Sequence, residues 1–214
     1  MMKNLLLTIF CLMLMSAFTG SASAAENRQW SFRVLLDGKE VGSQHFVLTD
    51  EDGTTRLETE ADFKVKFMFA TVYRYMHRNV ETWEGNCLSE IKSTTDANGK
   101  PFSVNGQQRN GFFEVTGDGQ QEKLPECIMS FAYWNPSFLE HSRLLNTQNG
   151  EYVDVEISTA EPVFRTIRGQ EVAALRYHLA AGELDLQLWY STEHEWLALE
   201  SKTKGNRVLS YELL

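Results

Sequence analysis

The feature that most constrains the fold of this chain is an alternation of apolar and polar residues that recurs along it. Apolar residues take every second position from Trp30 to Leu36, from Val153 to Ile157 and from Leu184 to Tyr190. Successive side chains of a β-strand point to opposite faces of a sheet, so a period of two predicts half-buried strands. Turn-forming residues separate these segments, and Asp37-Gly38 indicates a type I′ hairpin. The pattern predicts an all-β fold with a minor α component.

The spacing of the predicted strands is that of an antiparallel meander. We expect a single curved antiparallel sheet or an incomplete β-barrel, with one short helix packed on or in it. The helix is predicted over residues 136–145, because Asn135 suits the N-cap, Pro136 the first helical position and Arg143 the last turn. The sequence shows no internal repeat or linker, so residues 25–214 are expected to form a single β domain.

The first 24 residues have the layout of a secretory signal peptide. Lys3 precedes an apolar run from Leu5 to Met15, and Ala22-Ser23-Ala24 forms an A-x-A cleavage site. The run is shorter than the roughly 20 residues that a transmembrane helix needs, and no later segment is long and apolar enough. We therefore expect an exported protein with no membrane span in its mature chain. The periplasm is the expected compartment, with release outside the cell as the alternative.

The cysteines agree with export. The expected mature chain keeps two of them, Cys87 and Cys127. Two cysteines in an oxidising compartment usually pair. A redox-active pair is the alternative, but these residues lack the C-x-x-C spacing. We predict a structural disulfide that closes a loop of about 40 residues and stabilises the fold by roughly 4 kcal/mol in the chain-entropy model.

Two aromatic-rich segments are the candidate ligand site. The first runs from Phe63 to Tyr75 and is predicted to be one long strand with a bend near Ala70, apolar on both faces over residues 68–72. The second runs from Cys127 to Gly150 and contains the predicted helix. Either their aromatic faces meet across a groove for an acyl chain, or the second segment fills the barrel as core. The candidate ligand-binding residues are Phe67, Phe69, Tyr73, Tyr75, Phe131, Trp134 and Phe138.

Other chemistries find little support in the sequence. A net charge of −9 without a Lys/Arg block does not suit nucleic acid. The five histidines lack chelating spacings, so neither a metal site nor a cofactor is predicted. His77 and Glu81 would share one face of a strand, where the carboxylate would orient His77 as a general base. No activated nucleophile accompanies them, and a buried hydrogen-bonded cluster is the preferred interpretation. No catalytic residue is predicted.

Several segments resemble an uncharacterised family of bacterial secreted domains, domain of unknown function 6134. The resemblance covers nearly the whole expected mature chain and is carried by Tyr73–His77, Glu81–Trp83 with Cys87-Leu88, Thr95–Gly99, Phe131–Pro136 and Leu144–Gly150. The segment from Leu188 to Leu199 is similar to a second uncharacterised family of periplasmic β proteins. Neither family brings a known activity, so the resemblance implies a free-standing periplasmic β domain.

Two functions are compatible with these features. The first is binding or carriage, without catalysis, of an apolar or amphipathic small molecule such as a lipid. It rests on the excess of aromatic residues and on a fold-level analogy with periplasmic half-barrel lipid carriers. The second is a protein-interaction or scaffold module of the cell envelope, with a filled core and a partner that the sequence does not identify.

Overall fold

The structure is a computed structural model that describes residues 26–67, 70–203 and 205–214. The expected signal peptide, residues 1–24, lies outside the described residues. The elements, in chain order, are β1 Glu26–Leu36, β2 Lys39–Glu51, β3 Thr54–Phe67, β4 Ala70–Glu84, β5 Cys87–Ala97, β6 Lys100–Arg109, β7 Phe112–Gly117, β8 Gln120–Pro125, the 3₁₀-helix η1 Pro136–Glu140, β9 Arg143–Leu145, β10 Tyr152–Asp154, β11 Glu156–Ile157, β12 Glu161–Ile167, β13 Gln170–Ala181, β14 Leu184–Tyr190, β15 Trp196–Thr203 and β16 Arg207–Leu213.

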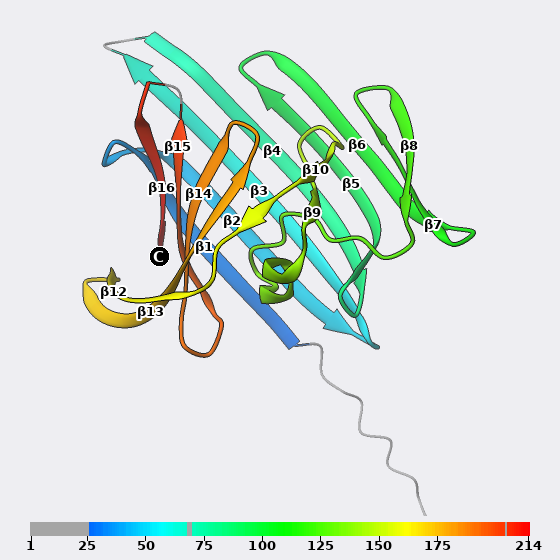
Figure 1. Ribbon diagram of the computed structural model, residues 1–214. Coiled ribbons are helices and arrows are strands. Elements are labelled where there is room, and N and C mark those ends of the chain that lie inside the picture. The colour runs from blue at the N-terminus through cyan, green and yellow to red at the C-terminus, as the bar shows by residue number, and fades with distance from the viewer. Residues whose placement is uncertain (1–25, 68–69, 204) are drawn as a thin grey trace, which may run out of the picture.

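One large antiparallel sheet dominates the fold (Figure 1). Its strands follow the order β11-β13-β14-β15-β16-β1-β2-β3-β4-β5-β6-β7-β8, and β12 pairs with β13 beside this path. The last strand lies against the first, because β16 pairs with β1 from Leu213 opposite Phe32 to Leu209 opposite Leu36. Among the described strands β11 and β8 end the path, so the sheet is curved and open rather than a closed barrel. The predicted fold class is confirmed.

The segment from Phe63 to Tyr75 is not a single strand, and that prediction was wrong. β3 ends at Phe67 and β4 begins at Ala70, and the two strands pair antiparallel as a hairpin. The apolar run carries no Gly, Pro, Asn or Asp to mark the reversal, so the alternation continues through it. Of the residues 68–72, which are apolar on both faces of the predicted strand, the structure describes 70–72, and Val72 is 52% exposed. Met68 and Phe69 lie outside the described residues.

Residues 126–155, here called the insert, leave the sheet after β8 and rejoin it at β11. In Figure 1 the insert, which carries η1, β9 and β10, lies against one face of the curved sheet. Its apolar residues belong to the same core cluster as the inward side chains of the sheet. The fully buried members from the insert are Ile128, Met129, Phe138, Leu144 and Leu145.

The helix of the insert is shorter than predicted. It spans five residues, Pro136–Glu140, rather than residues 136–145. Asn135 caps it as expected, with its side-chain oxygen accepting a hydrogen bond from the Ser137 N–H at 3.1 Å. Arg143, expected in the last helical turn, instead begins β9, which pairs with β10. Leu144 and Leu145 are therefore buried as part of a strand rather than a helix. A short apolar run does not distinguish the two.

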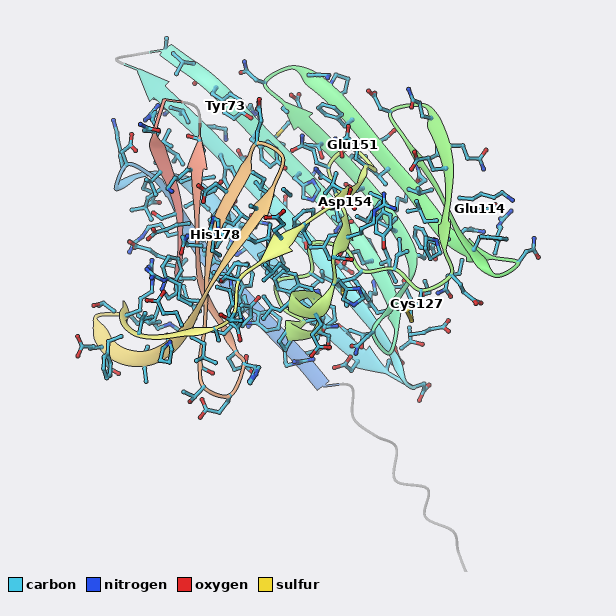
Figure 2. The ribbon with its side chains drawn as sticks, viewed as in Figure 1. Tyr73, Glu114, Cys127, Glu151, Asp154 and His178 are labelled. Carbon is cyan, nitrogen blue, oxygen red and sulfur yellow. A yellow bond between two sulfur atoms is a disulfide. The ribbon has the colours of Figure 1, made fainter. Side chains whose placement is uncertain are left out.

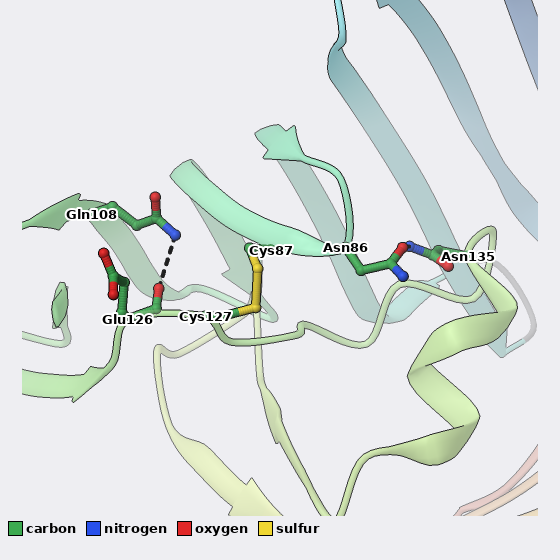
Figure 3. The surroundings of a disulfide bond; sticks show 6 residues. All are labelled: Asn86, Cys87, Gln108, Glu126, Cys127 and Asn135. Carbon is green, nitrogen blue, oxygen red and sulfur yellow. Dashed lines mark hydrogen bonds between the residues drawn. A yellow bond between two sulfur atoms is a disulfide. The ribbon is translucent and has the colours of Figure 1, made fainter. Parts of the chain in front are cut away.

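A disulfide between Cys87 and Cys127 joins the insert to the start of β5, with the two Cα atoms 4.8 Å apart (Figure 3). Beside it the Leu88 N–H donates to the Ile128 carbonyl at 3.0 Å. Farther along, the backbones of Gly117 and the insert approach so closely that a Cβ on Gly117 would lie 2.2 Å from the Asn149 carbonyl oxygen. The insert is thus held against the sheet at both of these places.

Within the described residues, no helix is long and apolar enough to cross a membrane.

Candidate ligand-binding cavity

A cavity of about 850 Å³ lies between the sheet and the insert. Its wall draws on β1 to β4, on β14 to β16 and on the insert. The volume falls within the range typical of small-molecule sites, which are lined mainly by apolar and aromatic side chains. The aromatic residues of the wall are Phe46, Phe63, Tyr73, Tyr75, Phe131, Tyr133, Trp134, Trp196 and Tyr211.

The cavity reaches solvent near the β3–β4 and β15–β16 hairpins. Val72 and Tyr73 line it at the start of β4 and are 52% and 40% exposed. Tyr73 lies toward the tip of the β3–β4 hairpin in Figure 2. Thr203 and Arg207, which flank the turn between β15 and β16, also line the cavity. We call this end of the cavity the mouth.

Below the mouth the wall is aromatic. The rings of Phe63 and Tyr75, opposite each other on β3 and β4, stack at 5.4 Å between centroids. Tyr211 meets Phe63 edge-on at 6.1 Å. The Tyr75 hydroxyl donates to Gln148 Oε1 at 3.2 Å, which connects β4 to the insert. Burial raises the pKa of Tyr75, so this phenol stays protonated and neutral.

The far end of the cavity is polar, and we call it the floor. His77, Asn79 and Glu81 occupy successive inward positions of β4 and line the cavity there. Glu81 is fully buried and accepts hydrogen bonds from Asn79 Nδ2 at 3.1 Å, Ser130 Oγ at 3.0 Å and Trp83 Nε1 at 3.0 Å. Burial raises the pKa of Glu81, and these three hydrogen bonds oppose that shift.

His77 is buried beside this cluster. Its Nδ1 pairs with Thr95 Oγ1 on β5 at 2.9 Å. Burial lowers the pKa of His77 to about 4, so the imidazole is neutral near neutral pH. Among the described residues, Asn79, Ser130 and Trp83 donate to the Glu81 oxygens and His77 does not. His77 and Glu81 are both buried, and each is hydrogen-bonded to partners of its own.

We expect His77 to make the fold sensitive to acid. Its folded pKa of about 4 lies below the ordinary value of 6.5, so between these values the unfolded chain binds a proton that the folded chain does not. The contribution of His77 to the free energy of unfolding is therefore fully present above pH 6.5, and about 3 kcal/mol of it is lost as the pH drops to 4. Glu81 acts in the opposite sense, because its raised pKa costs stability as the pH rises through 4.5.

Urea unfolding between pH 4 and pH 6.5 measures this dependence. The variant His77→Gln should lose less stability across that interval than the natural protein. Parallel curves for the two proteins would show that His77 is not the group responsible.

The structure brings four of the seven predicted ligand-binding residues to the cavity wall, namely Tyr73, Tyr75, Phe131 and Trp134. Phe138 is fully buried in the core, where its ring packs edge-on against Tyr133 at 5.7 Å, and it is not among the lining residues. Phe69 lies outside the described residues, and the side chain of Phe67 is not described.

Sequence reasoning missed part of the wall. Tyr211 and Trp196 lie far along the chain from β4, and only the pairing of β16 with β1 brings that part of the sheet around. Thr59 and Asn79, which lie directly opposite each other on β3 and β4 and both line the cavity, were missed as well. Among the residues that the structure describes, no group of three His, Cys, Asp or Glu side chains is placed to hold a metal ion.

An open, curved β-sheet that holds an internal cavity defines the class of this protein. The chain belongs to the family described as domain of unknown function DUF6134, whose model matches residues 32–213. This confirms the first resemblance drawn from the sequence.

Among solved structures, the fold is similar to a β-barrel-like protein of domain of unknown function DUF1849 from Brucella abortus. The TM-score is 0.62 at 7% sequence identity, over 87% of this chain and 94% of that chain. A likeness at this identity concerns the fold alone, and it supports the second, weaker resemblance. No curated protein matches the chain.

Proposed function

We propose that the protein binds an apolar or amphipathic small molecule, such as a lipid, in the cavity and carries it without chemical change. The observation that carries the proposal is the 850 Å³ space between the sheet and the aromatic insert. Protein interiors are normally packed without such voids, since unfilled space forfeits dispersion contacts. The alternative of a scaffold module assumed a filled core, so the cavity favours the carrier.

We also propose that the protein acts in the periplasm. The signal-like sequence of residues 1–24 and the Cys87–Cys127 disulfide support export to an oxidising compartment. A carrier with a cavity lined largely by apolar side chains suits an aqueous compartment between two membranes, because it shields an acyl chain from water. Native mass spectrometry of the protein taken from a periplasmic extract should show a bound small molecule.

Titration with an environment-sensitive fluorescent fatty acid tests the proposal. The delipidated protein should bind it saturably, and Phe131→Asp should weaken binding at least tenfold, because the new charge lies in the apolar wall. Phe131 is only half-buried, so the variant should fold.

Phe112→Asp is the matched control. Phe112 is 47% exposed on β7 and does not line the cavity, so this variant should bind like the natural protein. If the natural protein does not bind, or if the two variants bind equally well, the carrier proposal fails and the interaction module becomes the better reading.

A further inference from the structure

The hairpin of β3 and β4 extends past both of its neighbouring strands. The described pairing of β2 with β3 ends at Phe63, and that of β5 with β4 begins at Tyr75. Beyond these positions the described strand pairs join β3 to β4 alone. In Figure 1 this hairpin, drawn in cyan, reaches beyond the turn that joins β1 and β2. We call residues 64–66 and 70–74 the hairpin tip.

The hairpin tip presents apolar side chains to solvent beside the mouth. Every residue from 70 to 74 is exposed, and Val72 and Tyr73, which are adjacent there, also line the cavity. A two-stranded ribbon is only marginally stable by itself, and exposed side chains add little to a core. The tip therefore contributes little to folding, and its position at the mouth indicates a role in what enters the cavity.

The same hairpin carries a surplus of positive charge. Residues 62–78 contain four basic residues and one acidic residue, whereas the whole chain has a net charge of −9. Lys64 and Arg74 lie directly opposite each other, and Lys66 follows two positions farther along β3. Lys64 and Arg74 alternate with the stacked aromatic pair of the wall, so they point to the outer face of the sheet. All three cations are exposed, and none of them lines the cavity.

Most of this charge is not balanced locally. Lys64 pairs with Asp62 at 3.1 Å, but Lys66 and Arg74 take part in none of the ion pairs among the described residues. Across the mouth, by contrast, Arg207 is paired with a carboxylate in the turn between β1 and β2 at 2.7 Å. The hairpin tip is therefore a basic and apolar edge on an otherwise acidic protein, which complements a negatively charged surface.

We propose that the hairpin tip docks the mouth of the cavity on a bilayer that contains anionic lipids. Lys64, Lys66 and Arg74 meet the negative headgroups. Val72 and Tyr73 lie at the boundary between headgroups and acyl chains, where an aromatic ring with one polar end is favoured. An acyl chain then passes from the bilayer through the mouth into the cavity without crossing water. The choice of a bilayer rests on the proposed function, because the cargo of a lipid carrier lies in a bilayer.

Cosedimentation with vesicles tests the docking. The natural protein should bind vesicles made of equal parts of phosphatidylcholine and phosphatidylglycerol, and should bind vesicles of phosphatidylcholine alone roughly 10- to 100-fold more weakly. Salt at about 1 M should weaken the binding, because the Debye length is then roughly 3 Å. Equal binding to both kinds of vesicle, or binding to neither, would overturn the inference. An acidic protein partner would then be the better occupant of the basic edge.

A triple variant tests whether the hairpin tip is the docking site. Lys64→Gln, Lys66→Gln and Arg74→Gln combined should weaken binding to the mixed vesicles roughly 10- to 100-fold, because three charges leave the membrane surface. In solution the variant should bind an uncharged fluorescent lipid as the natural protein does, because none of the three residues lines the cavity. Its uptake of the same probe from mixed vesicles should be slower than that of the natural protein.

A second triple variant with the same change of net charge is the matched control. Arg56→Gln, Arg109→Gln and Lys123→Gln alter exposed cations outside the hairpin tip and outside the cavity wall, so vesicle binding should be nearly unchanged. Equal losses in the two triple variants would show that net charge, not the tip, governs binding, and the docking site would be wrong. If the natural protein binds mixed vesicles through the tip but takes up no probe, the docking site stands and the carrier proposal fails.

Discussion

Replacing Cys87 and Cys127 with serine should lower the free energy of unfolding by about 4 kcal/mol. The bond joins residues 40 apart in the sequence, and in the chain-entropy model a loop of that length gives about this stabilisation by restricting the unfolded chain. Neither cysteine is fully buried, so little packing is lost with the sulfur atoms. Urea unfolding of the double variant and the oxidised protein measures the difference.

The loss should appear first in the insert. The disulfide pins Cys127, the second residue of the insert, to the start of β5 (Figure 3). Without it, the hydrogen bond from Leu88 to the Ile128 carbonyl and that from Asn135 to Asn86 still hold this end. Hydrogen exchange should therefore show the amides of the insert opening before those of β3 and β4. The chemically reduced natural protein should behave as the variant does, and equal stability of its oxidised and reduced forms would contradict the prediction.

Local patterns of the sequence were enough to predict the strands and many of the turns. Trp30, Phe32 and Val34 alternate in the sequence and are all buried on folding, because one face of the sheet is covered. The predicted turn at Asp37-Gly38 has positive φ at both residues, 52° and 74°, as a type I′ turn requires. In both cases a local feature determines the structure. For the strand it is the face of the sheet to which each side chain points, and for the turn it is the positive φ that the two residues tolerate.

The errors arose where the sequence carries no local signal that decides the structure. The β3–β4 reversal occurs inside an apolar run, and Leu144 and Leu145 pair as a strand although their spacing also suits a helix. The choice between a filled core and a groove depends on how far the sheet curves before β16 meets β1, which no local pattern contains. The polar floor was visible only in part, because His77 and Glu81 share a strand whereas Ser130, which donates to Glu81, comes from the insert.

Trp83 supports the floor from outside the cavity wall, and Trp83→Ala should lower the free energy of unfolding by about 4 kcal/mol. The side chain is fully buried, its N–H donates to Glu81 Oε2, and its ring holds Trp134. Trp83→Phe keeps most of the packing and removes the N–H, so it should cost about 1–2 kcal/mol by leaving Glu81 one donor short. Urea unfolding followed by circular dichroism measures both variants without relying on tryptophan emission.

Trp189→Ala separates stability from binding in this comparison. Trp189 is also buried, but it belongs to a separate cluster with Ala174 and Ala198, does not line the cavity, and packs under the Arg165 guanidinium at 3.6 Å. The Trp189→Ala variant should also lose several kcal/mol of stability. Lipid-probe binding, measured where all variants remain folded, should weaken in Trp83→Ala, because Trp134 loses its support, and should persist in Trp189→Ala. Equal binding by these two variants would show that Trp83 contributes to the core alone and that the floor does not depend on it.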